Sequence, residues 1–195
     1  MANRICVING HPDGDPGHFC HALSDAYSDG AAAAGLAVDR VDVAQIAPAC
    51  LLRPADFATE PTDPNMLAAR EAINTADHVA IVFPIWLGTM PALLKAFFEQ
   101  MARGGFAISG QEGGGWPTQH LKGRSARIIV TMGMPAIAYR LWFLNAGVSN
   151  LKRLILGLSG MGPIRQTTIG GIGALDDAGR RKWLARVKDL GSAGR

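Results

Sequence analysis

The chain has 195 residues, of which 48% are hydrophobic and 18% are charged, so it can bury the core of one well-packed domain. We therefore expect a single domain spanning residues 1–195. The 19 basic and 16 acidic residues leave a net charge of +3, too weak an excess to indicate a nucleic-acid or membrane-surface partner. A run of about 18 apolar residues and a signal-like start are both missing, so we expect a cytoplasmic protein that is not membrane-embedded.

The spacing of the charged, cysteine and histidine residues argues against a basic binding patch, a disulfide framework and a metal site. The densest basic cluster lies at helical spacing near the end of the sequence and is typical of a solvated helix face; it comprises Arg180, Arg181, Lys182, Arg186 and Lys188. The three cysteines are far apart and form no CxxC motif, which fits a reducing cytoplasm. The five histidines show no HxxxH or HxH spacing, so we expect no metal site.

The first third of the sequence predicts two strands around a helix. Residues 4–9 (RICVIN) are a short β-rich run and predict the first strand. From Phe19 onward, apolar residues recur at steps of three and four, which predicts a helix that ends between Gly30 and Gly35. Residues 37–44 alternate between apolar and charged, which predicts a second, less buried strand.

A long connection separates this unit from the next one. Residues 47–64 contain four prolines and little periodicity, which indicates a surface segment. Asp63 and Pro64 provide an N-cap and a proline at the first helical position for the helix that follows. The run 78–84 (HVAIVFP) is apolar throughout, as a strand covered on both faces should be, and another helix begins near Pro91.

The remaining sequence predicts two more strands. Residues 104–125 hold seven glycines and indicate a long loop or excursion, and residues 126–133 (ARIIVTMG) predict the fourth strand with its outgoing loop. The other predicted elements are helices at about 137–145 and 149–158, a strand at 164–169 and a helix at 176–190.

Strands that alternate with helices predict an α/β fold of three layers with right-handed crossovers. Five strands fit a flavodoxin-like parallel sheet of order 2-1-3-4-5 better than the six strands of a full dinucleotide-binding fold. Ligands of such sheets bind outside the carboxyl ends of the strands. The candidate site therefore comprises the loops at residues 10–19, 84–91 and 131–139.

The first loop, within GHPDGDPGHFCHAL, lacks both the GxGxxG pattern and the lysine of a P-loop. It nevertheless leads into a helix, whose first N–H groups and dipole suit a phosphate. His11 and His18 can add hydrogen bonds. The alternative is an ordinary loop with two surface histidines.

The other two loops offer groups for a flat ligand. Trp86 lies at the rim of the predicted sheet and provides a planar apolar wall there, unless it plugs the end of the core. Gly133 permits close approach of backbone N–H groups, and Tyr139 brings a phenol toward the same edge. The alternative for this third loop is a plain turn.

Four stretches together resemble the flavodoxin-like NAD(P)H:quinone oxidoreductases: GHPDGDPGHFCHAL, VFPIWLGTMPALLKAFFEQM, GGFAI and ARIIVTMGMPAIAYR. This group includes mammalian quinone reductase, bacterial drug-modulator proteins and ancillary subunits of glutathione-gated potassium efflux systems. The resemblance covers nearly the whole chain, and the order and spacing of the motifs agree. The block FP-x-W-x-G-x-MPA-x-LK is its most specific part.

The resemblance implies a bound flavin, FAD or FMN, with NAD(P)H as reductant. The residues that would hold its phosphates are His11, His18, Phe19 and Cys20. The residues that would line its isoalloxazine ring are Pro84, Ile85, Trp86, Leu87 and Gly88. Backbone groups would hydrogen-bond the polar edge of the ring at Thr131, Met132, Gly133 and Met134. Tyr139 would lie near the N1/O2 side of the ring.

The chain departs from the family at two places. His18 and Cys20 stand where the family often has Ser and Asn. The family commonly has a histidine six or seven residues after the tyrosine, where this chain has Asn145 and Ala146. An asparagine donates a hydrogen bond but supplies no proton at neutral pH, so of the two catalytic candidates, Tyr139 and Asn145, the tyrosine should carry more of the role.

Members of this family transfer a hydride from NAD(P)H and then reduce a quinone in the same pocket, typically as homodimers. We expect a second copy to cover the segment 104–122 and the apolar residues Trp142, Phe143 and Leu144. One alternative is a flavin-binding regulatory subunit of a potassium efflux system, peripheral to a membrane partner. Another is an α/β binding protein without flavin. The sequence does not decide whether the flavin is FMN or FAD, whether the reductant is NADH or NADPH, or which molecule is the acceptor.

Overall fold

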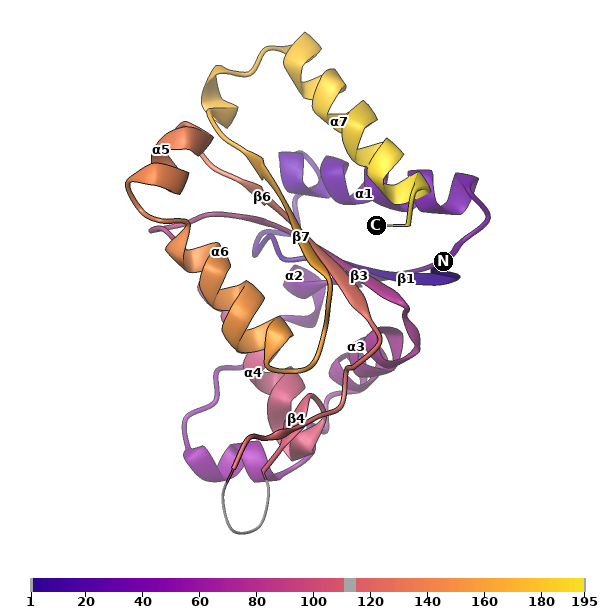
Figure 1. Ribbon diagram of the computed structural model, residues 1–195, viewed down its shortest axis with the longest axis vertical. Coiled ribbons are helices and arrows are strands. Elements are labelled where there is room, and N and C mark those ends of the chain that lie inside the picture. Colours follow the sequence, from indigo (N-terminus) through magenta and orange to yellow (C-terminus); the bar gives the residue numbers. More distant parts are fainter. Residues whose placement is uncertain (1, 111–114, 195) are drawn as a thin grey trace.

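The computed structural model describes residues 2–110 and 115–194. Five parallel strands form the central sheet, and their order β2-β1-β3-β6-β7 is the predicted order 2-1-3-4-5 (Figure 1). The strands are β1 (Arg4–Asn9), β2 (Ala37–Asp42), β3 (His78–Pro84), β6 (Ser125–Thr131) and β7 (Ile164–Ile169). The predicted three-layer α/β architecture is thereby confirmed.

Helices cover both faces of the sheet (Figure 1). One face carries α1 (Phe19–Ala33) and α7 (Asp177–Ser192). The other carries α3 (Pro64–Thr75), α4 (Ala92–Ala102) and α6 (Ala146–Asn150), which continues into the π-helical segment η3 (Leu151–Gly157). The short helices are α2 (Val43–Ile46) and α5 (Ala136–Leu141), with 3₁₀ turns at Pro54–Ala58 (η1), Arg103–Gly105 (η2) and Ile172–Ala174 (η4). In the part of the chain that the structure describes, no helix has the length and apolarity needed to cross a bilayer.

The alternation of side chains along the strands builds two cores. In β1, Ile5 and Val7 face the α1/α7 layer, whereas Cys6 and Ile8 face the α3/α4 layer. All seven residues of β3 are buried, as expected for a strand covered on both faces. The predicted start of α3 is confirmed, since the Asp63 carboxylate accepts the Met66 N–H at 2.9 Å.

Three predicted boundaries are wrong. The second strand ends at Asp42, and the next four residues turn into α2. The helix predicted for 137–145 ends at Leu141, because Leu144 and Asn145 have φ of 51° and 54°, values that an α-helix does not contain. The helix predicted for 149–158 begins earlier, at Ala146, and is π-helical from Leu151.

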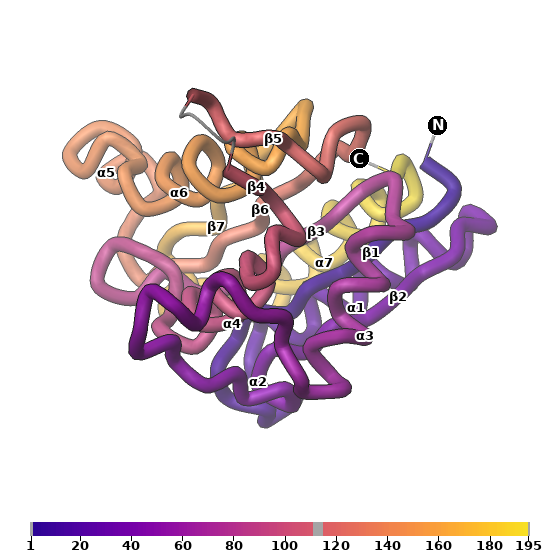
Figure 2. The backbone as a smooth tube through the Cα atoms, turned by 90° about the horizontal axis from the view of Figure 1, so that it is seen from below, coloured from indigo at the N-terminus to yellow at the C-terminus, as the bar shows by residue number. Residues whose placement is uncertain are grey.

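The glycine-rich segment forms an antiparallel ribbon of β4 (Ile108–Ser109) and β5 (Thr118–Gln119). The ribbon lies beside η3 (Figure 2), and the Gln119 side-chain amide donates to the Gly157 carbonyl at 3.3 Å. Just beyond both elements, the Leu121 N–H donates to the Ser159 carbonyl at 3.0 Å. The ribbon therefore packs near the amino ends of the strands, which differs from the expected position of 104–122 around the ligand edge. Residues 111–114 of that expected surface lie outside the described residues.

Helices α1 and α7 approach closely through two glycines. A Cβ atom built on Gly30 would lie 2.0 Å from the Lys188 carbonyl oxygen, and one on Gly191 would lie 2.1 Å from the Tyr27 carbonyl oxygen. Each glycine therefore faces the backbone of the other helix, which cannot yield as a flexible side chain would. This contact anchors α7 over the sheet.

We expect Gly30→Ala to destabilise the protein by about 1–3 kcal/mol, because the two helices must separate to admit the methyl group. In an open helix the same change stabilises by about 1 kcal/mol, so the sign of the effect identifies the contact. Urea unfolding measures it. Gly173→Ala is the control: a Cβ there meets nothing within 4 Å, and its unfolding free energy should change by at most about 0.5 kcal/mol. A stabilised Gly30→Ala protein would contradict the expectation.

Candidate functional site

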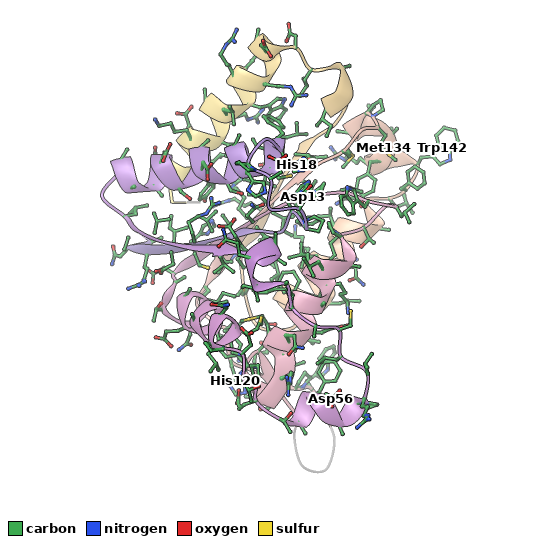
Figure 3. All side chains as sticks on the ribbon, turned by 180° about the vertical axis from the view of Figure 1, so that it is seen from behind. Asp13, His18, Asp56, His120, Met134 and Trp142 are labelled. Atoms are coloured by element: carbon green, nitrogen blue, oxygen red, sulfur yellow. The ribbon has the colours of Figure 1, made fainter. Side chains whose placement is uncertain are left out.

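Three loops follow the carboxyl ends of three neighbouring strands and meet at one end of the molecule. They connect β1 to α1, β3 to α4 and β6 to α5. Figure 3 shows Asp13, His18 and Met134 toward this end, and His120 and Asp56 at the other. The structure thus brings together the three segments that the sequence singled out.

Two carboxylates hold the first loop. Asp13 lies 2.9 Å from the Nε2 atom of His18 and accepts the Asp15 N–H at 3.0 Å. Asp15 in turn accepts the Gly17 N–H at 2.8 Å. The His18 side chain is the main cause that lowers the pKa of the exposed Asp13 carboxylate. Two of the loop N–H groups that could face a phosphate are therefore occupied by the loop's own acidic side chains.

Imidazole rings gather where this loop enters α1. His11 stacks on His18 with ring centroids 4.1 Å apart, and it meets the Trp86 ring edge-on at 6.0 Å. The Nε2 atom of His21 lies 2.9 Å from the Asp13 carbonyl oxygen. Burial lowers the pKa of His11, which favours its neutral form. His21 was missed by the sequence argument, although its three-residue spacing from His18 on a helix signals proximity.

Phe19 and Cys20 begin α1, and their side chains contact the protein. The Cys20 Sγ atom lies 3.3 Å from the Thr131 hydroxyl oxygen, and burial raises the pKa of its thiol to about 11. Cys20 therefore has only its backbone N–H, in the first turn of α1, to offer a phosphate. The Phe19 ring lies under the guanidinium of Arg180 at 5.2 Å. The sequence placed Arg180 on a solvated helix face, whereas the structure puts this cation beside the start of α1.

The second loop forms a tight turn that displays two apolar side chains. Trp86 and Thr89 exchange backbone hydrogen bonds of 2.9 and 3.0 Å. Leu87 and Gly88 between them have φ of 47° and 83°, the pattern of a type I′ turn. Trp86 is 49% exposed and the Leu87 side chain is fully exposed, so Trp86 does not plug the core. The turn is tied to β6, since the Ile85 N–H donates to the Thr131 carbonyl at 2.7 Å.

The third loop offers fewer backbone groups than predicted. The Met132 N–H donates to the Ile169 carbonyl at 3.0 Å, and the Met132 and Met134 carbonyls accept N–H groups from the segment after β7. Within the described residues, the N–H groups of Gly133 and Met134 have no hydrogen-bond partner. A Cβ built on Gly133 meets nothing within 4 Å. The N–H groups open to a flat ligand are therefore those of Gly133 and Met134, while Met132 serves the fold.

Tyr139 is buried and its hydroxyl group is committed to the protein. The hydroxyl donates to the Gly88 carbonyl at 2.8 Å. Burial raises the pKa of Tyr139, and hydrogen bonds from the Val148 and Gly147 N–H groups oppose that rise. A Cβ on Gly147 would lie 2.1 Å from the Gly88 oxygen, so the start of α6 also packs on the turn. The hydroxyl group thus holds the turn, and the contact of the phenol with a ligand stays a prediction.

Asn145 caps α6 with its backbone, and its side chain pairs with Gln166. The two amides exchange hydrogen bonds of 2.8 and 2.9 Å, and Gln166 also donates to the Thr168 hydroxyl at 2.8 Å. The amide of Asn145 is thus directed to strand β7. The structure places this predicted catalytic residue as a clamp on the αL turn that precedes α6.

Comparisons with known proteins agree with this architecture. A family model described as a flavodoxin-like fold matches residues 3–190. No curated protein sequence matches the chain. The crystal structure of Smu.1420 from Streptococcus mutans is similar with a TM-score of 0.81 and 26% identity, covering 97% of this chain and 99% of that one.

Two further structures carry names that describe an activity. The NAD(P)H:quinone oxidoreductase from Methanothermobacter marburgensis has a TM-score of 0.77 at 20% identity, covering 98% of both chains. An FMN-dependent NADH-azoreductase from Bacillus anthracis, solved with FMN, has a TM-score of 0.76 at 16% identity, also covering 98% of both chains. At these identities the similarity concerns the fold alone.

We expect Tyr139→Phe to lower the free energy of unfolding by about 1–3 kcal/mol, because the Gly88 carbonyl and the α6 N–H groups lose their partner. Tyr27→Phe is the matched control, since Tyr27 is equally buried and its hydroxyl has no partner among the described residues. Removing that hydroxyl should be neutral or stabilising. Urea unfolding of both variants decides, and equal losses would show that the Gly88 contact contributes nothing specific.

Proposed function

The chain belongs to the family of flavodoxin-like fold whose model spans it, and from this premise we propose that it is a flavin-dependent NAD(P)H oxidoreductase for quinones or related acceptors. The observation that carries the proposal is the convergence of three loops at the carboxyl edge of the sheet. Trp86 provides a half-exposed apolar wall there, and Gly133 opens onto free space. A planar ring with a polar edge suits that combination.

The described residues fit a flavin at both of its ends. The Gly133 and Met134 N–H groups would bind the polar edge of the isoalloxazine, and the turn Trp86–Gly88 would lie against the ring. The first turn of α1 would bind the phosphate, helped by His11, His18 and the nearby Arg180. Asp13 and Asp15 oppose an anion in that loop, so their carboxylates must turn away from the N–H groups they occupy.

The flavin, when bound, would accept a hydride from NAD(P)H and pass two electrons to the acceptor, which takes up two protons to become a quinol when it is a quinone. We propose a ping-pong sequence, in which NAD(P)+ leaves before the acceptor enters over the same exposed side of the site. Tyr139 positions the turn, and water or the acceptor's surroundings supply the protons. FAD and FMN remain alternatives. A cytoplasmic location fits the three free cysteines, Cys6, Cys20 and Cys50.

We propose in addition that a second copy of the chain covers the apolar surface beside this site. The patch consists of exposed side chains on α5, on the turn between Trp86 and Thr89, and on the turn that follows α5. Their exposed fractions are 105% for Leu87, 68% for Ile137, 68% for Leu141, 85% for Trp142 and 77% for Leu144. It borders a pocket of about 740 Å³ beside Tyr139 and the Asn145–Gln166 pair. Apolar surface concentrated next to a site is typical of an interface.

The cofactor proposal predicts that the purified protein carries a flavin or takes one up. Titration with FMN and FAD, followed by absorbance and by quenching of flavin fluorescence, should give one flavin per chain. Trp86→Ala should weaken binding by roughly 5- to 150-fold, since about 1–3 kcal/mol of apolar contact is lost. Trp116→Ala is the control, because Trp116 is 82% exposed and lies next to the ribbon. A protein that takes up neither flavin would overturn the proposal.

The interface proposal predicts a dimer by sedimentation velocity at micromolar concentration. Charging the patch with Leu141→Glu and Leu144→Glu together should weaken self-association by at least about 10-fold, because both charges would be buried in the interface. Leu52→Glu changes an equally exposed leucine outside the patch and should leave the dimer intact. A parent protein that sediments as a monomer would contradict the interface.

A further inference from the structure

We propose that the chain carries a second ligand site, a pocket between α4, η3 and the β4–β5 ribbon that takes a small, uncharged, hydrophobic molecule. The pocket has a volume of about 230 Å³. Its floor is formed by β1 and β3, through Ile8, Val79 and Ile81. It lies on the face of the sheet opposite to α1 and α7.

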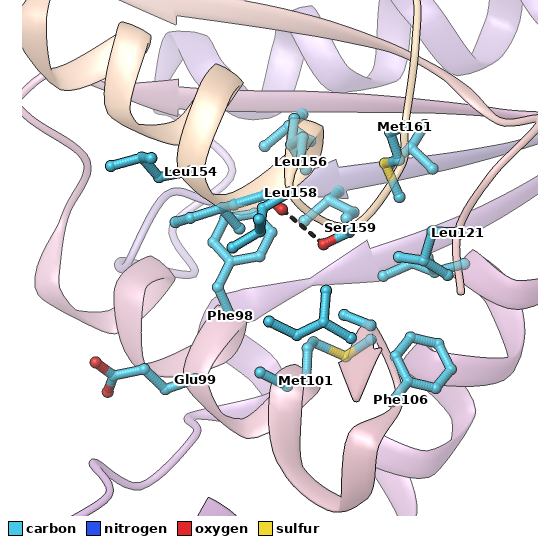
Figure 4. A pocket seen from close by; sticks show the side chains of 18 of the residues that line it. Phe98, Glu99, Met101, Phe106, Leu121, Leu154, Leu156, Leu158, Ser159 and Met161 are labelled. Carbon is cyan, nitrogen blue, oxygen red and sulfur yellow. Dashed lines mark hydrogen bonds between the residues drawn. The ribbon is translucent and has the colours of Figure 1, made fainter. Parts of the chain in front are cut away.

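The pocket is walled by helix α4, by the segment that follows it, and by η3 with the residues after it (Figure 4). Helix α4 contributes Phe98 and Met101, and the segment leading into the ribbon contributes Phe106. The third wall comes from η3 and the residues after it, including Leu156 and Leu158. Figure 4 shows these side chains pointing into a common space, so the opening is a feature of the packing rather than a shallow surface dip.

The chemistry of the walls defines the ligand. The Ser159 hydroxyl is already used, since it donates to the Ile155 carbonyl at 2.6 Å. Lys95 and Glu99 pair with each other at 2.5 Å on the exposed side of α4. The described lining thus offers no unpaired charge and no free donor, and a charged or strongly polar molecule would lose its hydration without compensation. An apolar cavity of about 150 Å³ admits benzene, so this pocket suits a larger body such as a fused pair of aromatic rings.

The rim gives a second reason for a ligand. Leu154 is 61% exposed and Phe57 is 42% exposed, although both border an apolar opening in which they could have been buried. One wall is π-helical, a rare geometry that is frequently found at functional sites. A hydrophobic guest would cover the rim side chains and fill the space that the π-helical segment leaves beside α4.

The site is separate from the edge where we propose a flavin. Val79 is the second residue of β3, whereas the turn with Trp86 follows the last residue of that strand. Leu121, on the opposite wall, precedes the start of β6. The pocket therefore lies along the face of the sheet between the start of β3 and the level of Ile8 and Ile81, and not among the loops beyond the carboxyl ends, so this inference does not depend on the proposed function.

Titration of the purified protein with 1-aminonaphthalene tests the site, because the fluorescence emission of this uncharged two-ring amine shifts to shorter wavelength on transfer from water into an apolar environment. We expect saturable binding of one probe per chain. Ala107→Phe places a ring in the pocket and should weaken probe binding at least 10-fold. Ala102→Leu, on another wall, adds fewer atoms and should also weaken probe binding. If Ala107→Phe loses the circular dichroism signal of the folded protein, Ala102→Leu serves as the test of the pocket.

Two controls distinguish the pocket from other apolar surface. Ala185→Phe adds the same ring on an exposed position of α7 and should leave probe binding unchanged. Leu144→Lys disrupts the patch on the other end and should also leave it unchanged. Flavin, added in excess, should not displace the probe. Undiminished binding in folded Ala107→Phe and Ala102→Leu, loss of binding in Leu144→Lys, or displacement by flavin would each overturn the proposal.

Discussion

One hydrogen bond, from the Tyr139 hydroxyl to the Gly88 carbonyl, joins the segments that follow two neighbouring strands. The start of α6 packs on the same turn, and that packing leaves no space for a Cβ at Gly147. The position of α6 depends in turn on the left-handed pair Leu144 and Asn145. The amide exchange between Asn145 and Gln166 holds that pair against β7. These contacts therefore connect the turn at Gly88, through α6, to the outer strand β7.

This arrangement has a cost that is visible in the backbone. Leu87 and Leu144 both have positive φ, which is unfavourable for a residue with a Cβ, and both side chains point into solvent. A leucine that is strained and also exposed gains nothing from the folded chain alone. Both lie beside the proposed site, and burial against the second copy that we propose would compensate this cost.

The fold could be predicted because the burial of a strand determines the pattern of apolar residues along it. The continuous apolar run of β3, the apolar–charged pattern of β2 and the Asp63-Pro64 start of α3 are local signals, and the elements they predict are present, with β2 ending at Asp42. The loops of the site were found by the same logic, since parallel strands deliver their carboxyl ends to one edge. The long-range contacts of side chains could not be predicted in this way. Nothing local indicates that Tyr139 meets Gly88 across 51 residues, or that Asn145 meets Gln166.

Other misses have the same origin in long-range contacts. Arg180 was assigned to solvent because its neighbours in sequence are basic, yet it reaches over Phe19 at the start of α1. The segment 104–122 was expected around the predicted site, whereas the ribbon it forms packs against η3. The π-helical geometry of Leu151–Gly157 carries no sequence signature that distinguishes it from an α-helix.

The balance of forces at the site differs between its two ends. At the first loop, Asp13 and Asp15 already accept N–H groups, and His18 already faces Asp13. A ligand phosphate there would replace the carboxylates of Asp13 and Asp15 on the N–H groups that they occupy. The net gain in binding free energy from these hydrogen bonds would therefore be small. At the other end, Trp86 is half exposed and the Gly133 N–H has no partner among the described residues, so both gain from a ligand without losing a protein contact. The ring end should therefore carry most of the binding energy, and the phosphate loop should mainly set the orientation.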